Sequence, residues 1–203
     1  MNSYQWLLFD ADNTLFDFDA AEDYALTRTL LHFGVEATPQ AKACYRQVNS
    51  SLWAAFERGE ISQDALLARR FANFLEAMSI QGESDQWDRY YTEALAHSST
   101  LLPGAEALCR RAAQKYTLAL ITNGVPYIQR TRLAGSSIAR YFGDRVFISG
   151  EMGCRKPEKA YFDKVLEALG ARTQKGKVLV IGDSLSSDIR GAFNAQLDSV
   201  WLH

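Results

Sequence analysis

Short apolar runs alternate with longer segments of helical periodicity along much of this chain. The apolar runs have the character of buried parallel strands and occupy Trp6–Phe9, 116–121, 145–149, 177–181 and 199–202. Helical patterns lie between the later runs, at 104–115, 126–134, 157–169 and 186–195. Strands that alternate with helices predict an α/β fold, in which right-handed crossovers join the strands of a parallel sheet.

The segment from about Asp17 to Ser99 breaks this alternation, because it contains four helical blocks and no convincing strand. Its large apolar residues recur at helical spacing and are Trp53, Phe56, Phe71, Phe74, Met78, Trp87 and Tyr91. We expect these side chains to form a helical core rather than a platform for stacking a base. The expected domains are therefore an α-helical module at 17–99, placed as a lid, and a core formed by residues 1–16 and 100–203.

Signals for helix starts and ends divide the helical module. Asp19 and Glu22 have the spacing of a capping box, in which the second side chain reaches back to the start of the helix. The later helices are expected to begin at Thr38-Pro39, Ser62 and Ser84, and the first two are expected to end at Gly34 and Gly59.

Composition narrows the class of protein. The 203 residues are 47% hydrophobic and 23% charged, which allows a sizeable core. The net charge of −2 and the lack of a basic run argue against nucleic acid as a partner. The cysteines are odd in number and scattered (Cys44, Cys109 and Cys154), as expected in a reducing compartment. Since the sequence shows neither a signal peptide nor a membrane-length apolar stretch, we expect a cytoplasmic monomer or small homo-oligomer without a membrane partner.

Acidic residues follow the first apolar run directly. Asp10, Asp12 and Thr14 come immediately after Trp6–Phe9, and open α/β sheets place their ligand crevice at the carboxyl ends of strands. Two carboxylates one residue apart repel each other at the rim of an apolar sheet, and a bound cation would relieve that repulsion. Taken alone, the same pattern is equally typical of an acidic turn.

Polar residues also end the later strands. Thr122-Asn123-Gly124 follows the second apolar run, Lys156-Pro157 follows the third, and Gly182-Asp183-Ser184 with Asp188 follows the fourth. The first motif could hold an oxyanion through its hydroxyl and backbone N–H groups, and the lysine would bring a cation toward the crevice. Each motif has a structural alternative: a plain turn, a solvated lysine, or an aspartate that caps the next helix. Four such clusters at one rim favour a common site over four coincidences.

With these motifs in this order, the chain resembles the haloacid dehalogenase-like hydrolase superfamily. The similarity rests on Asp10-x-Asp12-x-Thr14, Thr122-Asn123, Lys156-Pro157 and Gly182-Asp183-x₄-Asp188, and it covers nearly the whole chain. It implies a Rossmann-like core with helices on both faces of the sheet and an α-helical cap inserted between the first two motifs. Three segments resemble the pyrimidine 5′-nucleotidase branch in particular, namely Phe9–Phe16, Asn49-x₂-Leu52-Trp53 and Ile121–Gly124.

The resemblance implies the chemistry of a phosphate transfer to a carboxylate. Asp10 would attack phosphorus and become an aspartyl-phosphate. Mg²⁺ would be held by the Asp10 side chain, the Asp12 backbone carbonyl and the Asp183 side chain, with Asp188 as an outer or variable ligand.

The same resemblance assigns the remaining motif residues. The Asp12 side chain would protonate the departing ester oxygen and later deprotonate the attacking water. Thr14 would help to orient Asp12 and, with Asn123, belongs to the expected phosphate-binding set. Thr122, the Asn123 N–H and Lys156 would neutralise the transferring group.

Asp12 also separates reactions within the superfamily. Dehalogenase-like members lack an acid at this position, because a departing halide needs no proton, whereas an alkoxide does. A phosphatase or phosphomutase is therefore favoured over a dehalogenase, and nothing specifically indicates a mutase.

Three hypotheses remain open at this level. The first is a Mg²⁺-dependent nucleotidase whose partner is a pyrimidine nucleoside 5′-monophosphate. The second is a phosphatase for another small metabolite, such as phosphoglycolate or a sugar phosphate. The third is a signalling receiver that stores a phosphoryl group on aspartate, although receivers lack such a helical insertion.

The chain departs from its relatives at Gln196, where they usually carry glycine. If the helix ends there in a left-handed turn, the conformation should cost about 1 kcal/mol for a residue other than glycine.

Overall fold

The computed structural model describes residues 4–172 and 174–203. The chain folds into two compact units. The α/β unit comprises the segment up to Phe18 and the segment from Ser99 onward, and the helical unit comprises Asp19–Ser98. In the α/β unit, the two segments that lead to the helical unit pair through an antiparallel β-bridge between Phe16 and Leu101.

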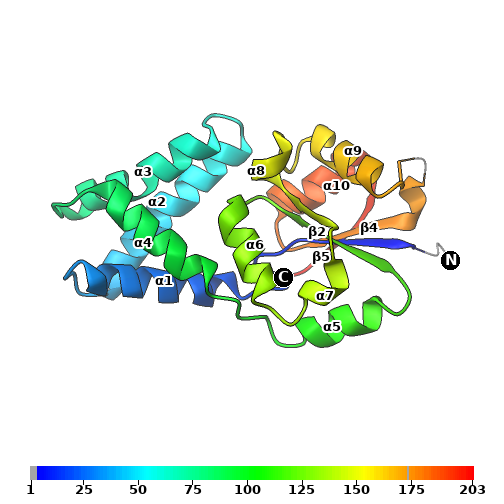
Figure 1. Cartoon of the computed structure of the whole chain (residues 1–203). Helices are drawn as coiled ribbons and strands as arrows, with labels where there is room; N and C mark the ends of the chain where they lie inside the picture. The colour runs from blue at the N-terminus through cyan, green and yellow to red at the C-terminus, as the bar shows by residue number, and fades with distance from the viewer. Residues whose placement is uncertain (1–3, 173) are drawn as a thin grey trace. The chain divides into compact units, whose positions relative to one another are not determined.

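The α/β unit is built on a five-stranded sheet with the order β3-β2-β1-β4-β5 (Figure 1). Its strands are all parallel and are β1 Trp6–Phe9, β2 Thr117–Thr122, β3 Val146–Ile148, β4 Val178–Gly182 and β5 Asp198–Trp201. β1 is central, since Leu8 pairs with Ala119 of β2 and with Val180 of β4. The α/β fold and the parallel sheet that the sequence predicts are confirmed.

Helices cover both faces of this sheet (Figure 1). One face carries α5 Ala105–Ala112, α6 Pro126–Ala134 and α7 Ala139–Phe142, and the other carries α9 Lys159–Ala168 and α10 Arg190–Ala195. Successive side chains of β1 alternate between the two: Leu7 and Phe9 pack with the first set of helices and Leu8 packs with the second. Because both faces are covered, the strands read as continuous apolar runs in the sequence.

Several short elements lay outside the sequence prediction. They are α7, α8 Ser149–Met152 and the 3₁₀ turn η1 Lys175–Lys177. The segment predicted as helical at 186–195 is helical, but its first half, Leu185–Ile189, is a π turn (η2) and only the second half, α10, is an α-helix. π turns are rare and often lie at functional sites. α10 ends at Gln196, whose φ of 61° is left-handed as expected.

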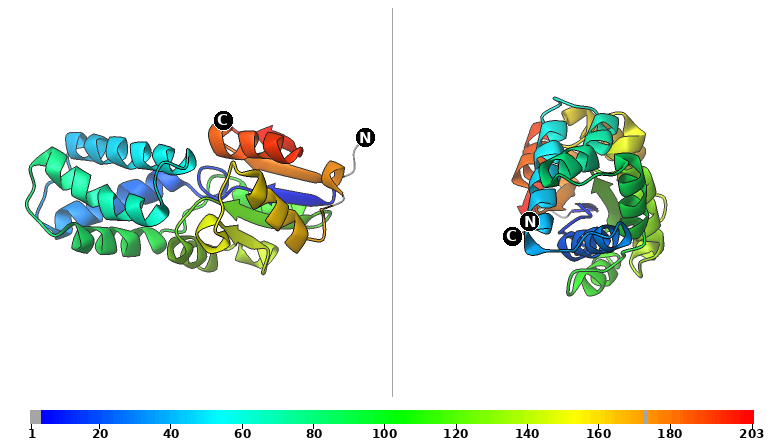
Figure 2. Two further views of the ribbon diagram at one scale, coloured as in Figure 1. Left: turned by 90° about the horizontal axis from the view of Figure 1, so that it is seen from above. Right: turned by 90° about the vertical axis from the view of Figure 1, so that its left-hand side faces the viewer.

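The helical unit consists of four long helices that lie side by side (Figure 2). They are α1 Phe18–His32, α2 Pro39–Glu57, α3 Gln63–Met78 and α4 Ser84–Ala96. Its core is largely aromatic: Phe71 contacts the rings of Tyr45, Phe74, Trp87 and Tyr91. Phe56, Phe71, Phe74, Trp87 and Tyr91 are buried, so their expected role as helical core is confirmed. Trp53 and Met78, from the same expected set, are only half-buried.

The capping signals had mixed outcomes. Thr38 and Ser62 cap α2 and α3, because their hydroxyls accept hydrogen bonds from Ala41 N and Ala65 N. The expected capping box of Asp19 and Glu22 is wrong, because α1 already begins at Phe18 and Asp19 lies within its first turn. The Glu22 carboxylate is buried and accepts a hydrogen bond from Asn49 Nδ2 at 2.8 Å, so it joins α1 to α2.

No helix within residues 4–172 and 174–203 is both long enough and apolar enough to cross a membrane.

Candidate active site

Three carboxylates converge at the carboxyl ends of two neighbouring strands. Asp10 follows β1, Asp183 follows β4, and Asp188 lies in the π turn after it. Each offers one carboxylate oxygen, and these oxygens all lie within 4.8 Å of one another. Since β1 and β4 are paired in parallel, residues far apart in the sequence meet at one rim of the sheet.

Lys156 joins this acidic cluster from the loop between α8 and α9. Its Nζ donates to Asp10 Oδ1 at 2.5 Å, to Asp188 Oδ1 at 2.6 Å and to the Ile121 backbone oxygen at 3.1 Å. The side chain is almost completely buried. The alternative of a solvated lysine is therefore wrong, and the ammonium group belongs to the site.

The charges in the cluster perturb one another strongly. Burial raises the pKa of the Asp10 carboxyl well above its ordinary value, an effect that Lys156 opposes and Asp188 reinforces. Burial and Asp188 likewise raise the pKa of Asp183. Burial would lower the pKa of Lys156, but Asp10 and Asp188 outweigh it and raise that pKa, so the lysine is charged. One ammonium group among three carboxylates leaves the cluster short of positive charge.

The π turn and a glycine together place Asp188. Ser184 caps this turn, because its hydroxyl accepts a hydrogen bond from Ser187 N, and its own N–H donates to Asp188 Oδ2 at 3.1 Å. A Cβ at Gly182 would lie 2.3 Å from Asp188 Oδ2, so a larger residue at 182 would displace this carboxylate. Asp188 is thus held toward the cluster, and the helix cap proposed as its alternative role is provided by Ser184.

The motif after β2 is tied to the lysine loop. Asn123 Nδ2 donates to the Lys156 backbone oxygen at 2.8 Å, and Lys156 N donates to Asn123 Oδ1 at 2.9 Å. The Lys156-Pro157 peptide bond is cis. Thr122 is buried, and its N–H donates to the hydroxyl of Tyr161, which in turn donates to Phe147 O. The Asn123 side chain therefore fixes the lysine backbone, while its N–H and the Thr122 hydroxyl are the groups expected to meet a phosphate.

Asp12 is held by residues that the sequence reasoning missed. Gln129 Nε2 donates to Asp12 Oδ2 at 2.7 Å, and Arg132 Nη1 donates to Asp12 Oδ1. Thr14, expected to orient Asp12, instead donates its hydroxyl to Asp183 Oδ1 at 3.4 Å. The signal for Gln129 and Arg132 was their spacing of three on the face of α6 that also buries Ile128 and Leu133, where apolar residues would be expected.

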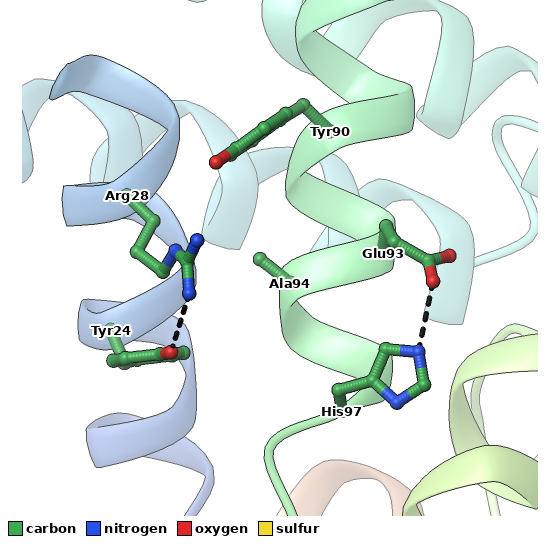
Figure 3. Close-up of a pocket in the computed structure, with 6 residues that line it drawn as sticks. All are labelled: Tyr24, Arg28, Tyr90, Glu93, Ala94 and His97. Atoms are coloured by element: carbon green, nitrogen blue, oxygen red, sulfur yellow. Dashed lines mark hydrogen bonds and ion pairs between the residues drawn. The ribbon is translucent and has the colours of Figure 1, made fainter. Parts of the chain in front are cut away.

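A separate hollow of about 270 Å³ lies in the helical unit (Figure 3). It is lined by Tyr24 and Arg28 of α1, by Tyr90, Glu93 and Ala94 of α4, and by His97, which directly follows α4. Arg28 Nη1 donates to the Tyr24 hydroxyl at 2.9 Å, and His97 Nε2 lies 2.9 Å from Glu93 Oε1. The residues that line this hollow include one arginine and one glutamate, so it lacks the excess of carboxylates found in the strand-end cluster.

Two named relatives are similar to this chain over nearly its whole length. The pyrimidine 5′-nucleotidase PynA of Streptococcus pneumoniae is 38% identical over 201 residues, which cover 98% of this chain and 84% of that protein. The pyrimidine 5′-nucleotidase YjjG of Escherichia coli is 35% identical over 200 residues, which cover 98% of this chain and 86% of that protein.

A solved structure is similar over nearly the whole chain. The crystal structure of the HAD-hydrolase YfnB from Bacillus subtilis, which is bound to magnesium and reveals interdomain movement in that protein, matches with a TM-score of 0.93 at 35% identity. The match covers 98% of this chain and 89% of that chain. The family model for haloacid dehalogenase-like hydrolases matches residues 4–196. The chain therefore belongs to the haloacid dehalogenase-like hydrolase family.

Proposed function

We propose that this chain is a Mg²⁺-dependent phosphatase that hydrolyses pyrimidine nucleoside 5′-monophosphates by way of a phosphorylated Asp10. The observation that carries the proposal is the meeting of Asp10, Asp183 and Asp188 at one rim of the sheet, where Lys156 pairs with Asp10 and Asp188. A carboxylate nucleophile, a cation site and a buried ammonium group are what transfer of a phosphoryl group to an aspartate requires.

The acidic cluster suits a divalent cation. Mg²⁺ prefers oxygen ligands, and the cluster offers three carboxylate oxygens within 4.8 Å of one another. We assign the side chains of Asp10 and Asp183 and the backbone carbonyl of Asp12 as its ligands, with Asp188 as a variable ligand. When bound, the cation would offset the negative charge shared by the nucleophile and the phosphate oxygens.

The first half-reaction transfers the phosphoryl group to the protein. An Asp10 carboxylate oxygen forms a bond to phosphorus, the ester P–O bond breaks, and its electron pair leaves with the ester oxygen. Asp12 gives that oxygen a proton. Lys156 supplies positive charge beside Asp10, and the Thr122 hydroxyl and Asn123 N–H bind the phosphoryl oxygens.

The second half-reaction restores the enzyme. Water forms a bond to phosphorus and gives its proton to Asp12, and the P–O bond to Asp10 breaks. Phosphate is released, and both carboxyl groups return to their starting states.

The names of the relatives PynA and YjjG support a pyrimidine nucleotide as substrate. We assign the helical unit as the cap that contacts the leaving group. A phosphatase for phosphoglycolate or a sugar phosphate is the alternative with the same chemistry. Membership of a hydrolase family favours turnover over the storage of phosphate by a signalling receiver.

Phosphate release across a panel of esters tests the proposal. The panel contains uridine and thymidine monophosphates, phosphoglycolate and a hexose phosphate, each with Mg²⁺ and with a chelator. We expect the two nucleotides to be hydrolysed faster than the other esters, and we expect the chelator and Asp10→Asn to abolish release. Asp163→Asn is the matched control, since Asp163 pairs with Lys159 on the surface of α9.

The possible outcomes separate the parts of the proposal. Equal rates on all esters would defeat the nucleotidase assignment and leave the phosphatase assignment intact. Undiminished release in the chelator would defeat the metal requirement. No release from any ester with Mg²⁺ would defeat the proposed function as a whole.

A further inference from the structure

We propose that Gln129 and Arg132 of α6 are positioning residues that hold the Asp12 carboxylate for its two proton transfers. The inference rests on the proposed function, in which Asp12 first protonates the ester oxygen and then deprotonates water. It extends that function by naming the groups that fix the direction of this carboxylate.

Both oxygens of Asp12 are held from the same helix. Gln129 Nε2 donates to Oδ2 at 2.7 Å, and Arg132 Nη1 donates to Oδ1. The two donors are three residues apart, so they project from one face of α6. A rotation of the carboxylate about its Cβ–Cγ bond breaks at least one of these hydrogen bonds, and the pair therefore fixes its plane.

Arg132 is itself immobilised. Its side chain is fully buried, and its guanidinium carbon lies 4.7 Å from the ring centre of Phe16 and 5.8 Å from that of Phe18. Its backbone oxygen accepts a hydrogen bond from Ser99 Oγ at 2.9 Å. A cation that is desolvated against two aromatic rings keeps one position, so the oxygen that it binds is held as well.

The loop after β2 leaves room for Gln129. A Cβ at Gly124 would lie 2.8 Å from both Cγ and Nε2 of Gln129. Gly124 follows Thr122 and Asn123, which are assigned to the phosphoryl group. The absence of a side chain at Gly124 therefore lets the Gln129 amide reach Asp12.

Packing alone does not account for these two residues. α6 buries Gln129 and Arg132 on the face where Ile128 and Leu133 are also buried, and apolar side chains there would avoid the cost of desolvating an amide and a cation. The Asp12 side chain keeps 24% of its surface exposed, so it can still reach a bound ester. The hydrogen bonds that hold the Asp12 carboxylate offset the desolvation of Gln129 and Arg132.

The test compares two esters that differ in how much the leaving group needs a proton. The value of kcat/KM reports the steps up to release of the leaving group. Uridine leaves as an alkoxide and needs the proton, whereas p-nitrophenolate leaves without one. For Gln129→Leu and Arg132→Met, we expect kcat/KM to fall by about 10²-fold on uridine monophosphate and by less than about threefold on p-nitrophenyl phosphate.

Two further variants separate positioning from loss of structure. Arg145→Met removes a half-buried guanidinium of the same unit that donates to Leu118 O at 2.8 Å and to Tyr141 O at 3.2 Å. We expect it to lower stability and to leave the ratio of the two kcat/KM values unchanged. Arg132→Lys keeps the cation but loses the planar fork, and we expect it to recover part of the uridine monophosphate rate.

Each outcome decides the inference. An equal fall on both esters, or no fall on either, would overturn the positioning role and leave the proposed function standing. Cleavage of neither ester by the wild-type protein would overturn the proposed function and the inference with it. If Arg132→Met does not fold, Gln129→Leu and Gly124→Ala decide the inference by the same ratio, because Gly124→Ala displaces Gln129 without removing a charge.

Discussion

The α/β unit and the helical unit each bury a cation beside acidic side chains, but the number of acids for each cation differs. In the helical unit, Arg70 donates to Asp88 at 2.6 Å and lies 4.7 Å from the ring centre of Tyr91. In the α/β unit, Lys156 forms ion pairs with both Asp10 and Asp188, and Asp183 lies beside these two carboxylates. One cation for one acid is an arrangement that holds helices together. One cation for three acids is an arrangement that calls for a further cation.

The two clusters also differ in the backbone that carries them. Arg70 projects from the middle of α3 toward Asp88 and Thr92, which are one turn apart on α4, so its charge lies between two packed helices. Lys156 lies in a loop, and its carboxylate partners lie at strand ends or in a turn. Buried charge between helices supports a fold, whereas charge at the ends of parallel strands can meet a ligand.

The largest expected effect comes from the nucleophile. Asp10→Asn should reduce kcat by at least about 10³-fold, since no carboxylate remains to accept the phosphoryl group. It should not lower the melting temperature, because it removes one of three crowded carboxylates whose burial already raises the pKa of Asp10. Steady-state kinetics and thermal melts measure the two effects. A fully folded variant with tenfold reduced activity would contradict the assignment.

The pair of Arg70 and Asp88 in the helical unit should affect stability and not activity. Arg70→Met should lower the free energy of unfolding by about 3 kcal/mol, because it leaves the Asp88 carboxylate without its cation. At a temperature where the variant is folded, kcat should match that of the wild type. Urea unfolding and kinetics at that temperature check the prediction. A large loss of kcat with little loss of stability would show that this pair is not merely structural.

A divalent cation bound by Asp10, Asp183 and Asp188 should stabilise the folded protein. At a Mg²⁺ concentration 100 times the Kd, the free energy of unfolding should rise by about 2.7 kcal/mol. Asp183→Asn should lose most of this gain, and Arg70→Met should keep it. Urea unfolding with Mg²⁺ and with a chelator provides the measurement. An equal gain in Asp183→Asn would place the bound cation elsewhere.

The smallest expected effect concerns the buried acid of the helical unit. Burial raises the pKa of Glu22 above its ordinary value of 4.5, against the hydrogen bond from Asn49, which lowers it. The folded state thus binds this proton more tightly than the unfolded state, and stability is lost as the pH rises from 4.5 through the folded pKa. Glu22→Gln should remove this loss, so its stability relative to wild type should increase from acid to neutral pH in urea titrations. A relative stability that falls over that range would contradict the sign.

The sequence predicted the α/β unit well, because its physical signals are strong there. A strand buried on both faces, such as Trp6–Phe9, must be apolar throughout. The carboxyl ends of neighbouring parallel strands must share a rim, so Asp10 and Asp183 could be expected to meet although 172 residues separate them.

The rest depended on contacts that no local pattern encodes. The hydrogen bonds of the π turn at Leu185–Ile189 span one residue more than those of an α-helix, and the amphipathic pattern is too short there to reveal the difference. Glu22 had the spacing of a capping box, but α2 offered its carboxylate a buried partner. The spacing of Gln129 and Arg132 placed two polar residues on one face of α6, but it did not identify Asp12 as their partner.

Rapid acid quenching followed by peptide mass spectrometry tests the central claim most directly. The protein is mixed with Mg²⁺ and uridine monophosphate and quenched within a single turnover. We predict one phosphoryl group on the peptide that contains Asp10, and none on that peptide in Asp10→Asn. Release of phosphate with Asp10 unmodified at every quench time, or a phosphoryl group on another residue, would contradict the account.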